Sequence, residues 1–272
     1  MTGSCCLLAM VVLAQATKTD ADTDLVKRWL AVCQSQAELY SLGPMNAERP
    51  RFQRLKDPIF RHATPARGND IGAVFLWIDA EQRPMVVSDI FAWSLNNDPK
   101  RQIVHECHSL AAEPLHVLLD GQPKWKPKQA GLKWEPLPEA PLPPAMKSQR
   151  SRQARELAQK LSAFSTDVQG GRWELRVLPQ PVYQYEAKET AGAMFAVCQG
   201  TDPELWFLLE ARSTQEGARW FYACATFTDY ALNVQWNGAE VWSCAKYQNG
   251  VNDESHWVEG VYSNVIAPEL PK

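Results

Sequence analysis

The chain lacks an excess of charge of either sign. Its 272 residues include 28 lysines and arginines and 31 aspartates and glutamates, for a formal net charge of −3. A protein that binds the phosphate backbone of nucleic acids needs a strongly basic surface, so we expect no nucleic-acid partner. Hydrophobic residues make up 45% of the chain, which excludes disorder and predicts a folded protein with a sizeable core.

Several motifs that reveal a chemistry are also missing. The sequence has no P-loop, no G-x-G-x-x-G turn, no G-x-S-x-G nucleophile elbow and no N-glycosylation site. It has no C-x-x-C pair, which argues against a zinc site built on thiolates. No apolar run approaches the roughly 20 residues that span a bilayer, so we expect no transmembrane helix in the mature chain. The sequence does not identify a cofactor.

The N-terminus has the pattern of a cleaved export signal. Residues 5–14 are ten consecutive apolar residues, and Ala14 and Ala16 supply the small-x-small spacing of a signal-peptidase site. The residues before this run include no lysine or arginine, so a buried first helix or a wrongly assigned start codon stay open as alternatives. We predict a signal peptide over residues 1–16 and a mature protein in the periplasm or outside the cell.

Cleavage there leaves an odd number of cysteines: Cys33, Cys107, Cys198, Cys224 and Cys244. Export would expose them to an oxidising compartment, but cysteine is also among the residue types most often buried. Disulfide pairing among the last three is therefore left open.

A proline-rich stretch divides the chain into two similar halves. Residues 126–147 contain six prolines, which remove backbone donors and favour extended conformations. We predict a first unit over residues 17–125, a connector over residues 126–147, and a second unit with a C-terminal tail over residues 148–272.

Both halves show the same order of predicted elements. Residues 24–41 carry an amphipathic helical stripe, and a second helix is predicted from Ser148, with its stripe continuing to Phe164. The turn dipeptides Asp120-Gly121 and Asn237-Gly238 fall at matching places. Each is typical of a type I′ hairpin, whose two central residues need positive φ.

Strand-like runs follow each helix, at residues 55–62, 72–79, 84–94 and 103–125 and at residues 178–185, 192–199, 203–213 and 220–242. Several are apolar on both alternating faces, so we expect each sheet to be covered on both sides. The predicted fold class is α+β: internally duplicated units, each a helix plus an antiparallel β-meander, packed as a pseudo-twofold. The alternative is that any two stretches with hairpins look alike.

The halves differ at four positions where only the first half carries ionisable groups. Aligned by the strand-like runs, Asp89, His105, Glu106 and His108 stand opposite Leu208, Tyr222, Ala223 and Ala225. Alternate side chains of a strand share a face. Glu106 and His108 should therefore point together, while His105 points to the opposite face.

This cluster is the candidate functional site. Asp89, Glu106 and His108 are the candidate catalytic residues, because a carboxylate beside an imidazole can serve as an acid–base pair. His105 and His108 are the candidate metal ligands, with Asp89 or His116 as further ligands. The spacing differs from H-E-x-x-H, where a helix brings both histidines to one face. An exposed face or a satisfied hydrogen-bond network is the structural alternative.

Aromatic residues suggest another kind of site. The chain has 11 tryptophans, and exposed aromatic platforms bind glycans or peptides. Most of them occupy strand positions, where large rings also fill sheet cores.

Three stretches resemble an uncharacterised family of exported bacterial proteins: GAMFAVCQGTDPELWFLLEAR at residues 192–212, LPQPVYQY at residues 178–185 and HECHSL at residues 105–110. The resemblance covers most of the mature chain. It implies export and a shared fold, and it transfers no activity, ligand or catalytic residue.

We therefore expect an exported, non-catalytic module that binds a protein, peptide or glycan. The alternative is a hydrolase or metal-dependent enzyme that uses Asp89, Glu106 and His108. A cleft where these side chains converge favours the enzyme, and a shallow aromatic groove favours binding.

Export predicts a specific mature N-terminus. N-terminal sequencing of the protein purified from its own host should begin near Thr17. A protein that retains Met1 would contradict the prediction.

Overall fold

The structure, a computed structural model, describes residues 23–45, 52–64, 70–94, 100–188, 190–245 and 256–266. The predicted signal peptide lies outside these residues. Within them, no helix is both long and apolar enough to cross a bilayer. In this part of the chain, Cys33, Cys107, Cys198 and Cys224 are buried free thiols.

The described chain is mainly β, with one helix at residues 23–38 and a second at α2 (Lys147–Ala158). The strands before α2 are β1 (Tyr40–Pro44), β2 (Gln53–Arg54), β3 (Phe60–Thr64), β4 (Asp70–Ile78), β5 (Pro84–Trp93), β6 (Lys100–Ser109), β7 (Leu115–Leu119), β8 (Gln122–Trp125) and β9 (Glu135–Pro136). Those after it are β10 (Leu161–Thr166), β11 (Arg172–Val177), β12 (Tyr183–Glu186), β13 (Thr190–Gln199), β14 (Asp202–Thr214), β15 (Gly217–Thr226), β16 (Ala231–Trp236), β17 (Ala239–Cys244) and β18 (His256–Ile266).

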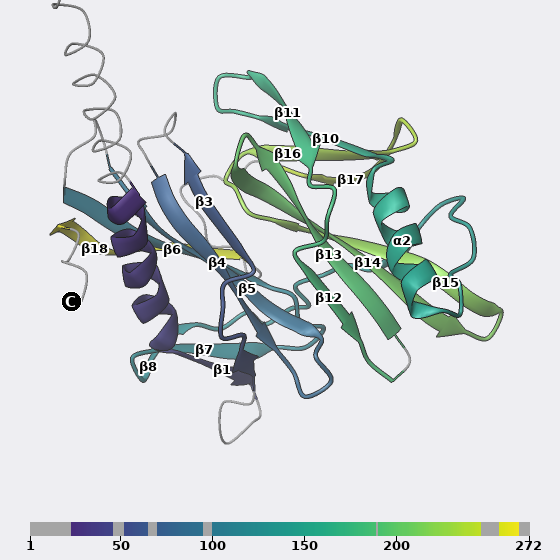
Figure 1. Ribbon diagram of the computed structural model, residues 1–272, viewed down its shortest axis with the longest axis horizontal. Coiled ribbons are helices and arrows are strands. Elements are labelled where there is room, and N and C mark those ends of the chain that lie inside the picture. Colours follow the sequence, from purple (N-terminus) through teal and green to yellow (C-terminus); the bar gives the residue numbers. More distant parts are fainter. Residues whose placement is uncertain are drawn as a thin grey trace, which may run out of the picture.

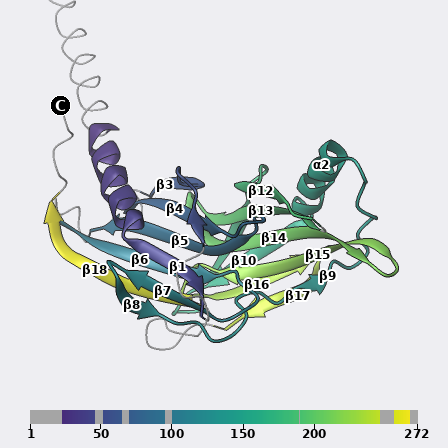
Figure 2. The same ribbon diagram turned by 90° about the horizontal axis from the view of Figure 1, so that it is seen from below.

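The strands form antiparallel sheets between two helices that lie at opposite ends of the molecule (Figure 1). A first sheet has the order β18-β6-β5-β4-β2, with β3 also paired to β4. A second has the order β17-β16-β10-β11-β13-β14-β15-β9, with β12 also paired to β13, and a small sheet holds β1-β7-β8. The second sheet curls, so that its strands wrap around its own core (Figure 2).

The predicted α+β class, with duplicated helix-plus-meander units packed as a pseudo-twofold, is wrong: the fold is mainly β. One reason is that α2 ends at Ala158. Leu161 and Phe164, which the helical spacing assigns to that helix, lie on β10, where buried and more exposed residues alternate. A stripe of period 3.6 and a short alternating strand share several apolar positions, so spacing alone does not separate them.

A second reason for the difference is that strands are exchanged across the molecule. β9, in the predicted connector, pairs with β15 of the second sheet. β18, at the far end of the described chain, pairs with β6 of the first sheet (Figure 2). Each sheet is therefore completed by a strand that follows the other half, which a self-contained meander does not allow.

The order of pairing among the central strands is nevertheless the same in both halves. β4 pairs with β3 and β5, and β5 with β6, just as β13 pairs with β12 and β14, and β14 with β15. The predicted hairpins are confirmed: Asp120, Gly121, Asn237 and Gly238 all have positive φ, and each pair joins two antiparallel strands.

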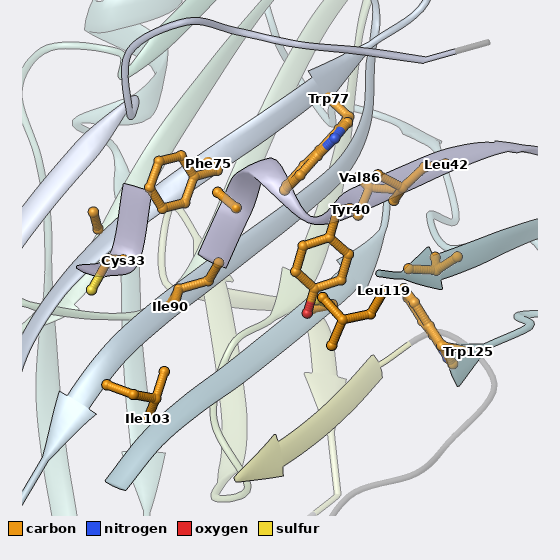
Figure 3. Close-up of a cluster of buried hydrophobic side chains, with 14 of the residues drawn as sticks. Cys33, Tyr40, Leu42, Phe75, Trp77, Val86, Ile90, Ile103, Leu119 and Trp125 are labelled. Carbon is orange, nitrogen blue, oxygen red and sulfur yellow. The ribbon is translucent and has the colours of Figure 1, made fainter. Parts of the chain in front are cut away.

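The described residues form three buried cores that hold these layers together. The first lies between helix 23–38 and one face of the first sheet, where Cys33, Tyr40 and Phe75 meet (Figure 3). The second lies between α2 and the second sheet. The third, which we call the inter-sheet core, contains Val74, Leu76, Ile78, Val87, Leu110, Leu132, Met194, Ala196, Cys198, Trp206, Leu208, Ala223, Ala225 and Phe227.

The inter-sheet core explains the strands that are apolar on both faces. On β4, Phe75 and Trp77 belong to the first core, whereas Val74 and Leu76 belong to the inter-sheet core. The expectation that these strands are covered on both sides is confirmed. The two sheets consequently meet face to face, and polar groups on the facing sides are enclosed at this contact.

Candidate functional site

A pocket of about 560 Å³ lies where the first sheet meets the second. Its walls come from β3 to β6, from the start of β14 and from the loop after β15. The lining residues are His62, Asp70, Asp89, Phe91, Trp93, Gln102, Val104, Glu106, Asp202, Glu204, Phe227, Thr228 and Asp229. Six of these described residues are carboxylates, and none of them is a lysine or arginine. We call this the acidic pocket.

His62 and Asp89 form a buried pair in its wall. Nε2 of His62 lies 2.7 Å from Oδ2 of Asp89, and the two side chains are 2% and 3% exposed. Burial disfavours a positive charge on His62, but Asp89, followed by Asp202 and Asp70, outweighs that cost and raises the pKa of His62 to about 9. His62 is therefore protonated at neutral pH.

Gly72 makes the approach of His62 possible. The two residues face each other across β3 and β4, and a Cβ at position 72 would lie 2.3 Å from Nε2 of His62. A larger residue would displace the ring. Gly192 stands in the same relation to Tyr185 in the second half, where a Cβ would lie 2.2 Å from the ring.

Asp202 joins this pair from the other sheet. His62, Asp89 and Asp202 each offer a donor atom, and the three atoms lie within 4.8 Å of one another. The turn before Asp202 is held against β3, because the hydroxyl of Thr201 donates a hydrogen bond of 3.1 Å to the carbonyl of Ala63. An imidazole and two carboxylates form a set that metal ions accept.

One buried oxygen of this cluster lacks a hydrogen bond. Oδ1 of Asp89 has no hydrogen-bond partner among the described residues, although the residue is 2% exposed. Buried carboxylate oxygens are nearly always hydrogen-bonded or bound to an ion, because removing a charged oxygen from water costs on the order of several kcal/mol.

Glu106 lies next to this cluster and has a histidine partner of its own. It stands directly opposite Asp89 in the β5–β6 register. Oε1 of Glu106 lies 2.7 Å from Nε2 of His256, a fully buried residue of β18. Burial raises the pKa of Glu106, and the interaction with His256 opposes this shift.

The structure brings together only part of the cluster predicted from the sequence. Asp89 and Glu106 line the acidic pocket. His108 is buried beside His256, with 5.8 Å between the ring centroids, and it is not a lining residue. His105 lies on the opposite face of β6, where the hydroxyl of Tyr40 is 2.5 Å from its Nδ1. His105 and His108 therefore do not converge on one metal ion.

Sequence reasoning missed three residues of the site: His62, Asp202 and His256. The alignment of the two halves already placed His62 opposite Tyr185, and Asp202 opposite Arg83 just before an aligned proline. The sequence contains both differences, but it does not indicate that His62 and Asp202, which lie far apart in the chain, meet in the fold. Nothing in the sequence pairs His256 with Glu106, because β18 has no counterpart in the predicted meander.

The second half has a pocket at the corresponding place, where arginines offset the negative charge. We call it the second pocket. A pocket of about 600 Å³ is lined there by Arg83, Tyr185, Glu210 and Arg212, among others. The hydroxyl of Tyr185 donates to Glu210 at 2.7 Å, and Arg212 forms an ion pair with the same carboxylate. The two pockets thus occupy related places and differ in charge.

Comparison with known proteins identifies no relative. No family model matches the chain, and no curated protein or solved structure matches it significantly. The uncharacterised family that the sequence resembles likewise has no assigned activity.

His105 gives a testable pH dependence. Burial, with a smaller contribution from Lys124, lowers the pKa of His105 to about 4. The unfolded chain binds this proton near pH 6.5, so the stability contribution of neutral His105 is complete above pH 6.5 and is lost as the pH falls towards 4. Urea unfolding should show a loss of roughly 3 kcal/mol over this range that His105→Gln abolishes. Equal pH dependence in both proteins would disprove the assignment.

Proposed function

We propose that this protein is an exported binding module that takes a positively charged ligand in the acidic pocket. The observation that carries the proposal is that six of the described lining residues are carboxylates and none of the described ones is a lysine or arginine. One of the six, Asp70, also interacts with Arg101. A pocket that concentrates negative charge attracts cations and repels anions.

The size of the electrostatic effect supports a bound cation. Two carboxylates about 4 Å apart repel each other by roughly 4 kcal/mol at the effective dielectric constant of a protein surface. A cation placed between them gains a comparable attraction from each. In the second pocket, Arg83 and Arg212 supply the positive charge. In the acidic pocket, His62 pairs with Asp89, and we propose that a ligand adds further positive charge.

Export and an internal repeat belong to this proposal. The apolar run before Ala16 supports export. The partly shared order of pairing supports a repeat of the β-strands. The order β8-β7-β1 matches β17-β16-β10, and β2-β4-β5-β6 matches β11-β13-β14-β15, whereas the pairing of β10 with β11 has no counterpart among the described strands of the first half. A repeat in which one pocket kept arginines and the other acquired carboxylates explains why the charged cluster occurs once.

The proposal predicts that cation binding depends on Asp89. Isothermal titration of the purified full chain with Zn²⁺ and, separately, with spermidine should show binding of at least one probe. Asp89→Asn should weaken that binding at least tenfold, because the carboxylate loses its charge and keeps its shape. Glu210→Gln in the second pocket is the matched control and should bind like the wild type.

Two results would oppose a cation-binding module. One is the absence of binding by both probes, and the other is equal affinity of the wild type and Asp89→Asn. Thermal melts of each variant establish that it is folded.

A hydrolase is the second candidate function, favoured by Glu106, which lines the same pocket and whose Oε1 lies 2.7 Å from Nε2 of the buried His256. Glu106, whose pKa is raised by burial, would take a proton from water. The resulting hydroxide would add to an ester carbonyl. Breakdown of the adduct would then release the alcohol, which takes the proton from Glu106 and restores the carboxylate. His108 lies behind His256 and would position it.

This candidate predicts hydrolysis that depends on Glu106. The full chain should cleave p-nitrophenyl esters faster than buffer, and Glu106→Gln should reduce the rate by a factor of about 100 or more. Glu210→Gln again serves as the control. Rates equal to buffer would leave the binding module as the function.

A further inference from the structure

We infer that the cation of the acidic pocket is a divalent first-row transition metal ion, held by a ring nitrogen of His62 and by the carboxylates of Asp89 and Asp202. This inference rests on the proposed function and names its ligand. The three residues come from β3, β5 and the start of β14, so the ion would tie the first sheet to the second (Figure 1).

The distances suit a metal ion. Ligand atoms about 2.1 Å from a tetrahedral ion lie roughly 3.4 Å apart. Nε2 of His62 and Oδ2 of Asp89 are 2.7 Å apart, and all three donor atoms fall within 4.8 Å. Small side-chain shifts bring the set to coordination distance, with the ion in place of the proton between His62 and Asp89.

The donor set selects the class of metal. Imidazole nitrogen favours zinc, iron, cobalt and related ions, while carboxylate oxygen is accepted by nearly all divalent cations. Calcium takes six to eight oxygen ligands and magnesium keeps an octahedral shell of oxygens, so one histidine with two carboxylates disfavours both. Three protein ligands also leave a fourth position directed to the pocket, as in zinc sites that bind a further group.

An independent observation points to a ligand at this place. Oδ1 of Asp89 is buried and has no hydrogen-bond partner among the described residues, and Asp89 lines the acidic pocket. A metal ion bound to Asp89 accounts for it, because a carboxylate can use either or both of its oxygens as ligands. His62 saturates only the other oxygen of Asp89.

The two halves differ at all three of the proposed ligand positions. By strand register, His62 corresponds to Tyr185, since each faces the glycine of the neighbouring strand. Asp89 corresponds to Leu208, since Val74 pairs with Asp89 and Met194 with Leu208. Asp202 corresponds to Arg83, each directly before a proline.

None of the three counterparts is suited to this role. A phenol, an alkyl group and a guanidinium stand where the acidic pocket has an imidazole and two carboxylates. All three differences are needed for a metal site and all occur in the same pocket. Gly72 completes it, because only glycine lets the ring of His62 cross β4 towards Asp89.

The test compares metal binding in matched variants of the full chain. After treatment with EDTA and buffer exchange, the wild type should bind one Zn²⁺ per chain in isothermal titration. Co²⁺ should produce visible absorption bands typical of a four-coordinate site. His62→Gln and Asp202→Asn should each weaken Zn²⁺ binding at least 100-fold and abolish the Co²⁺ bands.

Gly72→Ala tests the placement of His62 without altering a ligand. It should weaken Zn²⁺ binding at least tenfold, whereas Gly192→Ala, which makes the same change beside Tyr185, should bind like the wild type. Asp202 lies at the end of a turn and is only half-buried, so Asp202→Asn keeps the test decisive if a buried variant fails to fold.

The outcomes separate this inference from the proposed function. If spermidine binds in an Asp89-dependent manner and Zn²⁺ does not, the pocket takes an organic cation and the metal inference is wrong. The same holds if Zn²⁺ binds equally well to His62→Gln and Asp202→Asn. If neither probe binds, the proposed function fails as well.

Discussion

The contact between the two sheets is the constraint on which the rest of the structure depends. β4 presents Phe75 and Trp77 to one layer and Val74 and Leu76 to another, so neither face is free to meet water. Burial of such side chains contributes roughly 1.5 to 3 kcal/mol each. Both faces of the first sheet are therefore buried, and one of them packs against the second sheet. This packing determines which residues of the two sheets meet at the edges of the inter-sheet core.

The acidic pocket is a product of that contact. Asp89 and Glu106 lie on the same face of their sheet as Val87, which belongs to the inter-sheet core, and Asp202 reaches them from the opposite sheet. Charges at the margin of an apolar contact interact more strongly than charges in water. Two carboxylates here each have a histidine partner: His62 lies 2.7 Å from Asp89, and His256 lies 2.7 Å from Glu106.

The sequence predicts the strands and turns well, because two-residue periodicity and the Asp-Gly and Asn-Gly dipeptides are local signals. It also predicts that Glu106 and His108 share a face, since both lie on one strand. The helix-to-strand change after Ala158 was missed because apolar positions at Leu161 and Phe164 fit both periods. His62, Asp202 and His256 were missed because only the tertiary contact between distant strands brings them to Asp89 and Glu106.

The pairing of β18 with β6 has a consequence for how the chain is made. Synthesis runs from the N-terminus, so β6 emerges well before residues 256–266, which cover its outer edge. Until then β6 presents unpaired backbone groups, and an open strand edge is a template for association with other chains. Glu106 acquires its partner His256 in the same late step. A nascent chain that stalls before β18 would contain most of the strands. The unpaired edge of β6, next to the acidic pocket, would then be open to association with other chains.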